Sequence, residues 1–159
     1  MARITTRYEL GLRLWSRAHS HPHPKGYEVP ALNFTLTKII VADIDAMEQF
    51  YIRTLGLSRI AYLEHGEGDT AFKEVILGTA DASQVAAKIS FVQYLAKASP
   101  TPGEAIVAFM VDDVAAVLAA MCDAGGAVAV PVQDIPEHRL KLAYVTDPEG
   151  HMVEIMQAL

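Results

Sequence analysis

The chain has 159 residues, 52% of them hydrophobic and 20% charged, which is typical of one globular domain or of two half-domains sharing a core. A formal net charge of −6 argues against nucleic acid as a partner, and no apolar run is long enough to span a bilayer. The single cysteine, Cys122, rules out an intrachain disulfide and fits a reducing cytoplasm, which is the location we expect.

The first 31 residues differ from the rest of the chain because they are basic and hold half of the histidines. Thr6 and Glu9 have the spacing of a capping box, which predicts a short helix over residues 7–18. The His- and Pro-rich run at 19–24 then ends the helix. We expect residues 1–31 to be an extension that docks on the domain or on a partner subunit.

The next segment, residues 32–95, predicts a strand, a helix and three more strands. Residues 34–41 are rich in Thr, Ile and Val and predict the first strand. Either Asp43 or Asp45 can cap the helix, which Gly56 closes. The remaining segments are strands at 58–65, 71–77 and 88–95, with a loop or short helical turn at 80–86.

The same order of elements returns after a Pro-containing linker at 96–103. The second segment, 104–158, predicts the following elements: a strand at 104–111, a helix at 113–124, and strands at 127–133, 140–146 and 151–156.

The two segments are copies of one pattern. Asp113 follows Asp43 by 70 residues in similar surroundings, and Gln157 follows Gln93 by 64. A unit of this length is too small to bury its own apolar face, so two copies must pack together. The seam between them is the natural place for a ligand.

Two runs carry a resemblance to a known family: Val-Ala-Asp-Ile-Asp at 41–45 and Ala-Tyr-Val-Thr-Asp-Pro-Glu-Gly-His-Met-Val-Glu-Ile at 143–155. With the paired pattern, they make residues 33–158 resemble the vicinal oxygen chelate superfamily, which includes glyoxalase I, extradiol dioxygenases and bleomycin-resistance proteins. The resemblance implies an α+β fold of two tandem βαβββ modules, whose curved sheet encloses a central cleft. It also implies a homodimer.

In metal-using members of that family, two side chains from each module bind a divalent ion. The resemblance places these ligands on the first and fourth strands, at Leu36, Ser90, Ile106 and Glu154. Leu and Ile have no lone pair for a metal, and a neutral Ser hydroxyl is a poor substitute for a carboxylate. We therefore expect no metal of the family type and no other cofactor.

Lys38 and Glu154 are the candidate catalytic residues. Their strand parity places both on the faces that the family turns toward its cleft. There they would pair with each other, or Lys38 would wait for an anionic ligand; alternatively, Lys38 extends to the rim of the cleft. By contrast, His138 and His151 are expected to be exposed loop histidines.

The other cleft candidates are mostly apolar, which predicts an adaptable pocket for an apolar or aromatic small molecule. The candidate substrate-binding residues are Leu36, Ile40, Phe72, Ser90, Ile106, Ala108, Tyr144, Met152 and Met156.

Two functions follow from the resemblance, and the sequence leaves open whether the protein is an enzyme. The first is a glyoxalase/bleomycin-resistance-like binding protein with a degenerate metal site. The alternative is a lyase or isomerase of the glyoxalase I (lactoylglutathione lyase-like) type, in which Glu154 is the base and Lys38 stabilises an enolate. An iron dioxygenase ranks last because it needs the missing ligands. A non-catalytic partner protein that uses residues 1–31 as its contact is the remaining reading.

Overall fold

The computed structural model describes residues 36–79, 88–103 and 105–159. The extension at 1–31 and its expected helix lie outside these ranges, as does the segment expected to be a loop or short helical turn at 80–86. None of the helices within the ranges combines the length and the apolar character needed to cross a membrane.

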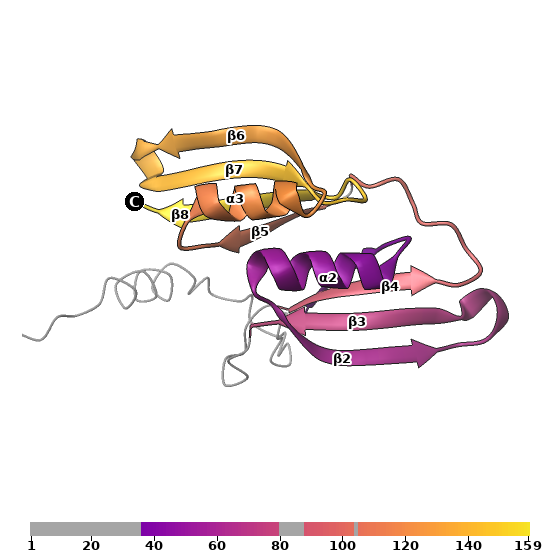
Figure 1. Ribbon diagram of the computed structural model, residues 1–159. Coiled ribbons are helices and arrows are strands. Elements are labelled where there is room, and N and C mark those ends of the chain that lie inside the picture. Colours follow the sequence, from indigo (N-terminus) through magenta and orange to yellow (C-terminus); the bar gives the residue numbers. More distant parts are fainter. Residues whose placement is uncertain (1–35, 80–87, 104) are drawn as a thin grey trace, which may run out of the picture. The chain divides into compact units, whose positions relative to one another are not determined.

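The first half folds as a strand, a helix and three more strands, as predicted (Figure 1). Its elements are β1 (Leu36–Ile40), α2 (Ile44–Leu55), β2 (Ser58–His65), β3 (Phe72–Gly78) and β4 (Lys88–Tyr94). A 3-10 turn, Gly68–Thr70, joins β2 to β3. The strands form a mixed sheet in the order β1-β4-β3-β2, in which only β1 and β4 are parallel.

The second half repeats this topology. Its elements are β5 (Ile106–Met110), α3 (Val114–Asp123), β6 (Ala127–Ile135), β7 (Leu140–Thr146) and β8 (Met152–Ala158). The sheet order is β5-β8-β7-β6, with β5 and β8 parallel. Strand β6 runs two residues beyond the predicted end and leads into a 3-10 turn, Pro136–His138. The fold is therefore α+β, with two βαβββ modules that each form a four-stranded sheet.

Both helices begin in the same way, which is the structural basis of the sequence repeat. Asp43 and Asp113 each accept a hydrogen bond, at 3.0 Å, from the backbone N–H three residues later. Gln93 and Gln157, at the ends of β4 and β8, each accept one from the first N–H of the helix, at 3.3 and 3.1 Å. These bonds satisfy donors that a helix start otherwise leaves unpaired.

Glycine closes α2 and follows α3 for different reasons. Gly56 has a left-handed backbone with φ of 65° and donates its N–H to the Ile52 carbonyl. Gly126 lies against other backbone: a Cβ there would be 2.6 Å from the Thr146 oxygen and 2.9 Å from the Met121 oxygen. The first position needs glycine for its conformation, and the second needs it for space.

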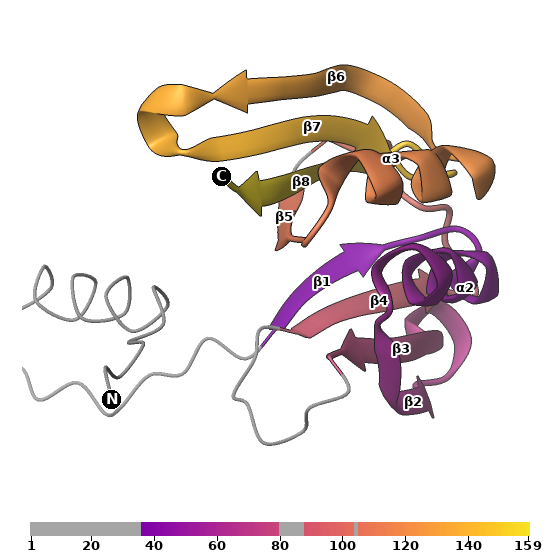
Figure 2. The ribbon, with the colours of Figure 1, turned by 60° about the vertical axis from the view of Figure 1, so that its left-hand side comes forward.

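One hydrophobic core joins the two halves. It contains buried side chains from α2, α3 and the strands of both sheets. The Tyr51 ring on α2 is 4.7 Å from Phe91 on β4 and 6.3 Å from Phe109 on β5. The two helices contact each other, and each lies beside its own sheet (Figure 2). We call the face of each sheet turned away from its helix the distal face.

The turn between β7 and β8 is bonded to the start of α2. The Glu149 carboxylate accepts hydrogen bonds, both at 2.7 Å, from the backbone N–H groups of Ala42 and Asp43. Behind it, the buried Tyr51 hydroxyl donates to the buried Asp147 carboxylate at 3.1 Å. These bonds fix the second half on the first.

His151 is buried, so the prediction of an exposed loop histidine was wrong at this position. Only 5% of the residue is exposed, because its N–H donates to Asp147 at 2.9 Å and draws it into the turn. Its buried Nε2 has no hydrogen-bond partner in the described part of the chain and lies 3.9 Å from the Glu149 carboxylate. His138 is exposed, as predicted.

Candidate functional site

Lys38, Glu74 and Ser90 form a polar cluster on the distal face of the first sheet. The Lys38 Nζ lies 2.9 and 2.8 Å from the two Glu74 carboxylate oxygens. The Ser90 hydroxyl donates to Glu74 Oε1 at 2.6 Å. The Lys38 side chain is 52% exposed, whereas that of Glu74 is only 5% exposed. The cluster thus holds a buried carboxylate from two sides and leaves a cation accessible.

Strand register explains how these residues meet. Strand β4 lies between β1 and β3, with Lys38 opposite Ser90 and Ser90 opposite Ile76. Glu74 is two residues before Ile76 and therefore points to the same face. The Lys38 side chain reaches across β4 to the Glu74 carboxylate, above the Ser90 position.

The electrostatics of the cluster favour an ionised Glu74. Burial by itself raises the pKa of a carboxyl group, but the hydrogen bonds from Lys38 and Ser90 and the Lys38 charge outweigh it. The pKa of Glu74 is consequently below its ordinary value. At neutral pH the cluster is a fixed ion pair.

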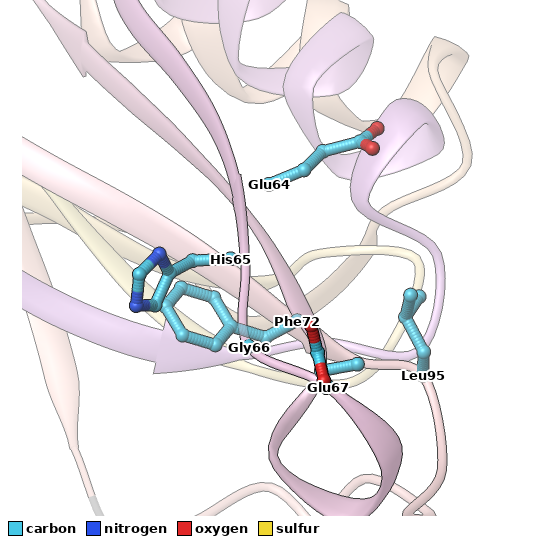
Figure 3. A pocket seen from close by; sticks show the side chains of 7 residues that line it. Glu64, His65, Gly66, Glu67, Phe72 and Leu95 are labelled. Carbon is cyan, nitrogen blue, oxygen red and sulfur yellow. The ribbon is translucent and has the colours of Figure 1, made fainter.

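Aromatic rings continue the same face toward one end of the sheet. The Phe72 ring on β3 lies 6.2 Å from Tyr94 on β4 in an edge-to-face contact, and 6.0 Å from His65 on β2. His65, Phe72 and Leu95 help to line a hollow of about 540 Å³ (Figure 3). In Figure 3 the His65 and Phe72 rings lie together, whereas the Glu64 carboxylate points away from them.

The distal face of the second sheet carries a different pair. The Tyr144 hydroxyl on β7 donates to Glu154 Oε1 on β8 at 2.8 Å. This hydrogen bond, supported by burial and by the Glu154 charge, raises the pKa of the Tyr144 phenol. Neighbouring β5 presents apolar side chains, and Ile106 and Met110 are 58% and 57% exposed.

The predicted site residues all lie on the two distal faces. On the first sheet these are Leu36, Lys38, Ile40, Phe72 and Ser90; on the second, Ile106, Ala108, Tyr144, Met152, Glu154 and Met156. The structure brings Lys38 to Ser90 and Tyr144 to Glu154. The ion-pair partner of Lys38 is Glu74 rather than Glu154.

Glu74 is the residue that sequence reasoning missed. It lies inside a run of otherwise mostly apolar residues, Phe72–Gly78, and it shares strand parity with Phe72, which was assigned to the site. An acidic residue at a cleft-facing position needs a partner, and Lys38 was the one cation proposed there. The signal was present, but pairing across an intervening strand depends on a sheet order that was not predicted.

The family-type metal site does not fit this chain. The four positions that the family resemblance assigns to metal ligands hold Leu36, Ser90, Ile106 and Glu154, of which only Glu154 provides a carboxylate. Near Ser90, a carboxylate is present from Glu74, but the Lys38 ammonium already occupies its open side. Among the described residues no three His, Cys, Asp or Glu side chains gather into a possible metal site.

These groups can support two kinds of chemistry. A fixed ammonium that is half exposed can donate to an oxygen anion of a ligand. A carboxylate such as Glu154, positioned by one hydrogen bond, can accept a proton. The surrounding apolar side chains can bury the remainder of a small molecule.

Comparison with known proteins places these features in a family. Residues 32–155 match the profile of the glyoxalase/bleomycin resistance protein/dioxygenase superfamily. The chain is 30% identical over 123 residues to a protein of Vibrio cholerae serotype O1 named probable lactoylglutathione lyase. That match covers 76% of this chain and 87% of the other.

Solved structures share the fold at lower identity. A glyoxalase family protein from Bacillus cereus is 17% identical with a TM-score of 0.71, covering 83% of this chain and 97% of the other. Glyoxalase I from Zea mays is 22% identical with a TM-score of 0.60, covering 77% of this chain and 45% of the other.

Proposed function

Because this chain belongs to the glyoxalase/bleomycin resistance protein/dioxygenase superfamily, we propose that it binds an apolar or aromatic small molecule in a cleft lined by the distal faces of its two sheets. The observation that carries the proposal is the residue set at the four metal-ligand positions. With Leu36, Ser90 and Ile106 in three of them, binding proceeds without the divalent ion of the family.

The side chains around these positions support a binding role. Met152 and Met156 on β8 lie on the same distal face as Ile106 on β5 and are partly exposed. Methionine and aliphatic side chains adapt to ligands of different shape, and burying apolar area supplies most of the affinity. Such a lining suits sequestration of a hydrophobic compound.

Two measurements test this function together. Elemental analysis of the tag-free protein, before and after dialysis against a chelator, should find no stoichiometric transition metal. A thermal-shift screen with aromatic compounds should raise the midpoint of unfolding, because a ligand that binds only the folded state stabilises it. A tightly held metal, or a screen in which no hydrophobic compound shifts the midpoint, would contradict the proposal.

A second candidate function is a lyase or isomerase of the glyoxalase I type. Two observations favour it: the name of the Vibrio cholerae relative, and the hydrogen bond that holds the Glu154 carboxylate. In this mechanism Glu154 removes a proton next to a carbonyl group. The Lys38 ammonium then stabilises the enolate oxygen that forms.

Formation of lactoylglutathione from methylglyoxal and glutathione, by the wild type and by Glu154→Gln, tests the second function. We expect the substitution to remove activity, whereas Glu137→Gln, on the exposed turn before β7, should retain it. Activity that survives Glu154→Gln would eliminate this mechanism. A wild type without activity would leave the binding function as the remaining candidate.

We further propose that the protein acts as a homodimer. The support is the exposure of Ile106 and Met110 on β5, an edge strand of the second sheet. Large apolar side chains that lie together on an exposed surface mark a contact with another molecule, and a second copy of the chain is the partner that we propose.

A further inference from the structure

We propose that the Lys38 ammonium takes the place of the family's metal cation and binds a carboxylate of the ligand, whose aromatic body lies against Phe72 and Tyr94. This inference rests on the proposed function, because it names the ligand class of the same site. The ligand is thus a small aromatic carboxylate rather than a neutral hydrophobic compound.

The cation of the cluster lies beside a position that metal-using members give to a ligand. Ser90 occupies the fourth-strand position where metal-using members carry a carboxylate ligand. Here Glu74 Oε1, which accepts the Ser90 hydrogen bond at 2.6 Å, supplies a carboxylate from the neighbouring strand. The Lys38 Nζ lies 2.8 Å from that oxygen. A carboxylate and a cation therefore remain at this place, but the cation is tethered to the chain.

The Lys38 ammonium has the capacity to bind a further group. An ammonium has three N–H donors, and Glu74 is its only acceptor within the described ranges. The Lys38 side chain reaches across β4 to Glu74 while half of it stays accessible. Because Ser90 also holds Glu74, the ammonium is fixed in position before a ligand arrives, which reduces the entropy lost on binding.

An aromatic pair lies next to the cluster. Phe72 is two residues from Glu74 on the same strand and the same face, about 7 Å away. Its edge-to-face contact with Tyr94, at 6.2 Å between ring centres, provides an aromatic wall. A third ring can pack against that wall while a carboxylate a few bonds away meets Lys38.

The test compares an acid with its neutral isostere. Binding of 4-phenylbutyrate and of 4-phenylbutyramide is measured by calorimetry on the full chain. We expect the wild type to bind the acid about tenfold more tightly, the difference that one charge-assisted hydrogen bond supplies. In Lys38→Met this preference should disappear while amide binding stays within about twofold of the wild type.

Two further variants keep the test decisive. Lys38→Met leaves the buried Glu74 charge without its cation, so the double variant Lys38→Met/Glu74→Gln removes both charges and should fold with the same loss of preference. Lys73→Met is the matched control, because Lys73 is adjacent to Glu74 on β3 but points to the other face. It should retain the preference for the acid.

The outcomes separate the two proposals. Equal binding of acid and amide by the wild type overturns the role of Lys38 and leaves the apolar binding function in place. Loss of the preference in Lys73→Met as well as in Lys38→Met also overturns it, because the effect would then be one of net charge. Failure of both compounds to bind overturns the ligand class and counts against the proposed function too.

Discussion

Three carboxylates are buried in the described part of the chain, and each has a fixed partner. Glu48 forms a two-pronged ion pair with Arg59, Glu74 binds Lys38, and Asp147 accepts the Tyr51 hydroxyl. Burying a charge is costly unless hydrogen bonds or an opposite charge compensate for it. Only the second of the three lies on a distal face, so it alone is placed to meet a ligand.

Glu149→Gln should weaken the link between the halves. Both carboxylate oxygens accept backbone N–H groups, and a glutamine would turn its NH₂ toward one of these donors. We expect the free energy of unfolding to fall by about 1–3 kcal/mol, measured by urea denaturation. Glu137→Gln on the exposed turn is the control and should change it by less than about 0.5 kcal/mol. Equal effects of the two substitutions would contradict this role.

Tyr51→Phe should lower the stability of the protein for a similar reason. It removes the hydroxyl donor to Asp147, which is buried and would lose one of its partners. We expect the free energy of unfolding to fall by about 1–3 kcal/mol. The control is Tyr62→Phe, which removes a hydroxyl that donates to the exposed Glu64 and should lower the free energy of unfolding by less than about 0.5 kcal/mol. The comparison is made from the midpoints of urea denaturation, provided that the dependence of the free energy of unfolding on urea concentration is the same in each variant. A Tyr51→Phe protein as stable as the wild type would argue against a contribution from the buried hydrogen bond.

The contribution of the Lys38–Glu74 ion pair to the stability of the protein should decrease at acid pH. Because the pKa of Glu74 is lower in the folded protein, its ionised form contributes stability that is complete above the ordinary carboxyl pKa. That contribution is lost as the pH falls through the folded-state value. Urea titrations between about pH 6 and 2 should show a smaller acid loss in Glu74→Gln than in the wild type. Parallel profiles would mean that Glu74 does not contribute in this way.

At the level of elements, the pattern of apolar residues along the sequence was sufficient to predict the order of strands and helices. The repeat around Asp43 and Asp113 predicted both helix starts, and the capping bonds confirm that of the first two candidate caps Asp43 is the one used. The irregular pairings within β2 and β6, and the burial of His151, were not predictable. They depend on contacts between segments distant in sequence, which local patterns do not encode.

Gly56, which closes α2, and Gly126, which follows α3, should respond differently to alanine. Gly126→Ala would push a Cβ against two backbone oxygens, so we expect a loss of about 3 kcal/mol. Gly56→Ala meets open space and only adopts an unfavourable left-handed backbone, at a cost of about 1 kcal/mol. Thermal unfolding of both variants tests which substitution lowers the stability more. A larger loss for Gly56→Ala than for Gly126→Ala would be inconsistent with the close approach of backbone at Gly126.

For the whole molecule, one core and the bonds of the β7–β8 turn make the halves interdependent. We expect them to unfold in a single transition. The sequence predicted which residues lie on the distal faces, because strand parity is a local property. It did not predict that Lys38 pairs with Glu74, because that contact depends on the placing of three strands.

Substitutions on the exposed edge strand of the second sheet test the proposed homodimer. Ile106→Glu combined with Met110→Glu places charges where apolar side chains are now exposed, and should shift sedimentation from dimer to monomer. Leu159→Glu, at another exposed apolar position, is the control and should leave the dimer intact. A wild type that sediments as a monomer would contradict the homodimer.

The hydrogen bonds of Glu149 also restrict which substitutions this sequence can accept. The carboxylate recognises peptide N–H groups rather than side chains, so the identity of residue 42 is nearly free while glutamate at 149 is not. Proline is the exception at 42, because it has no N–H to donate. One half of the repeat therefore carries the whole specificity of the contact, and the other half can diverge without weakening it.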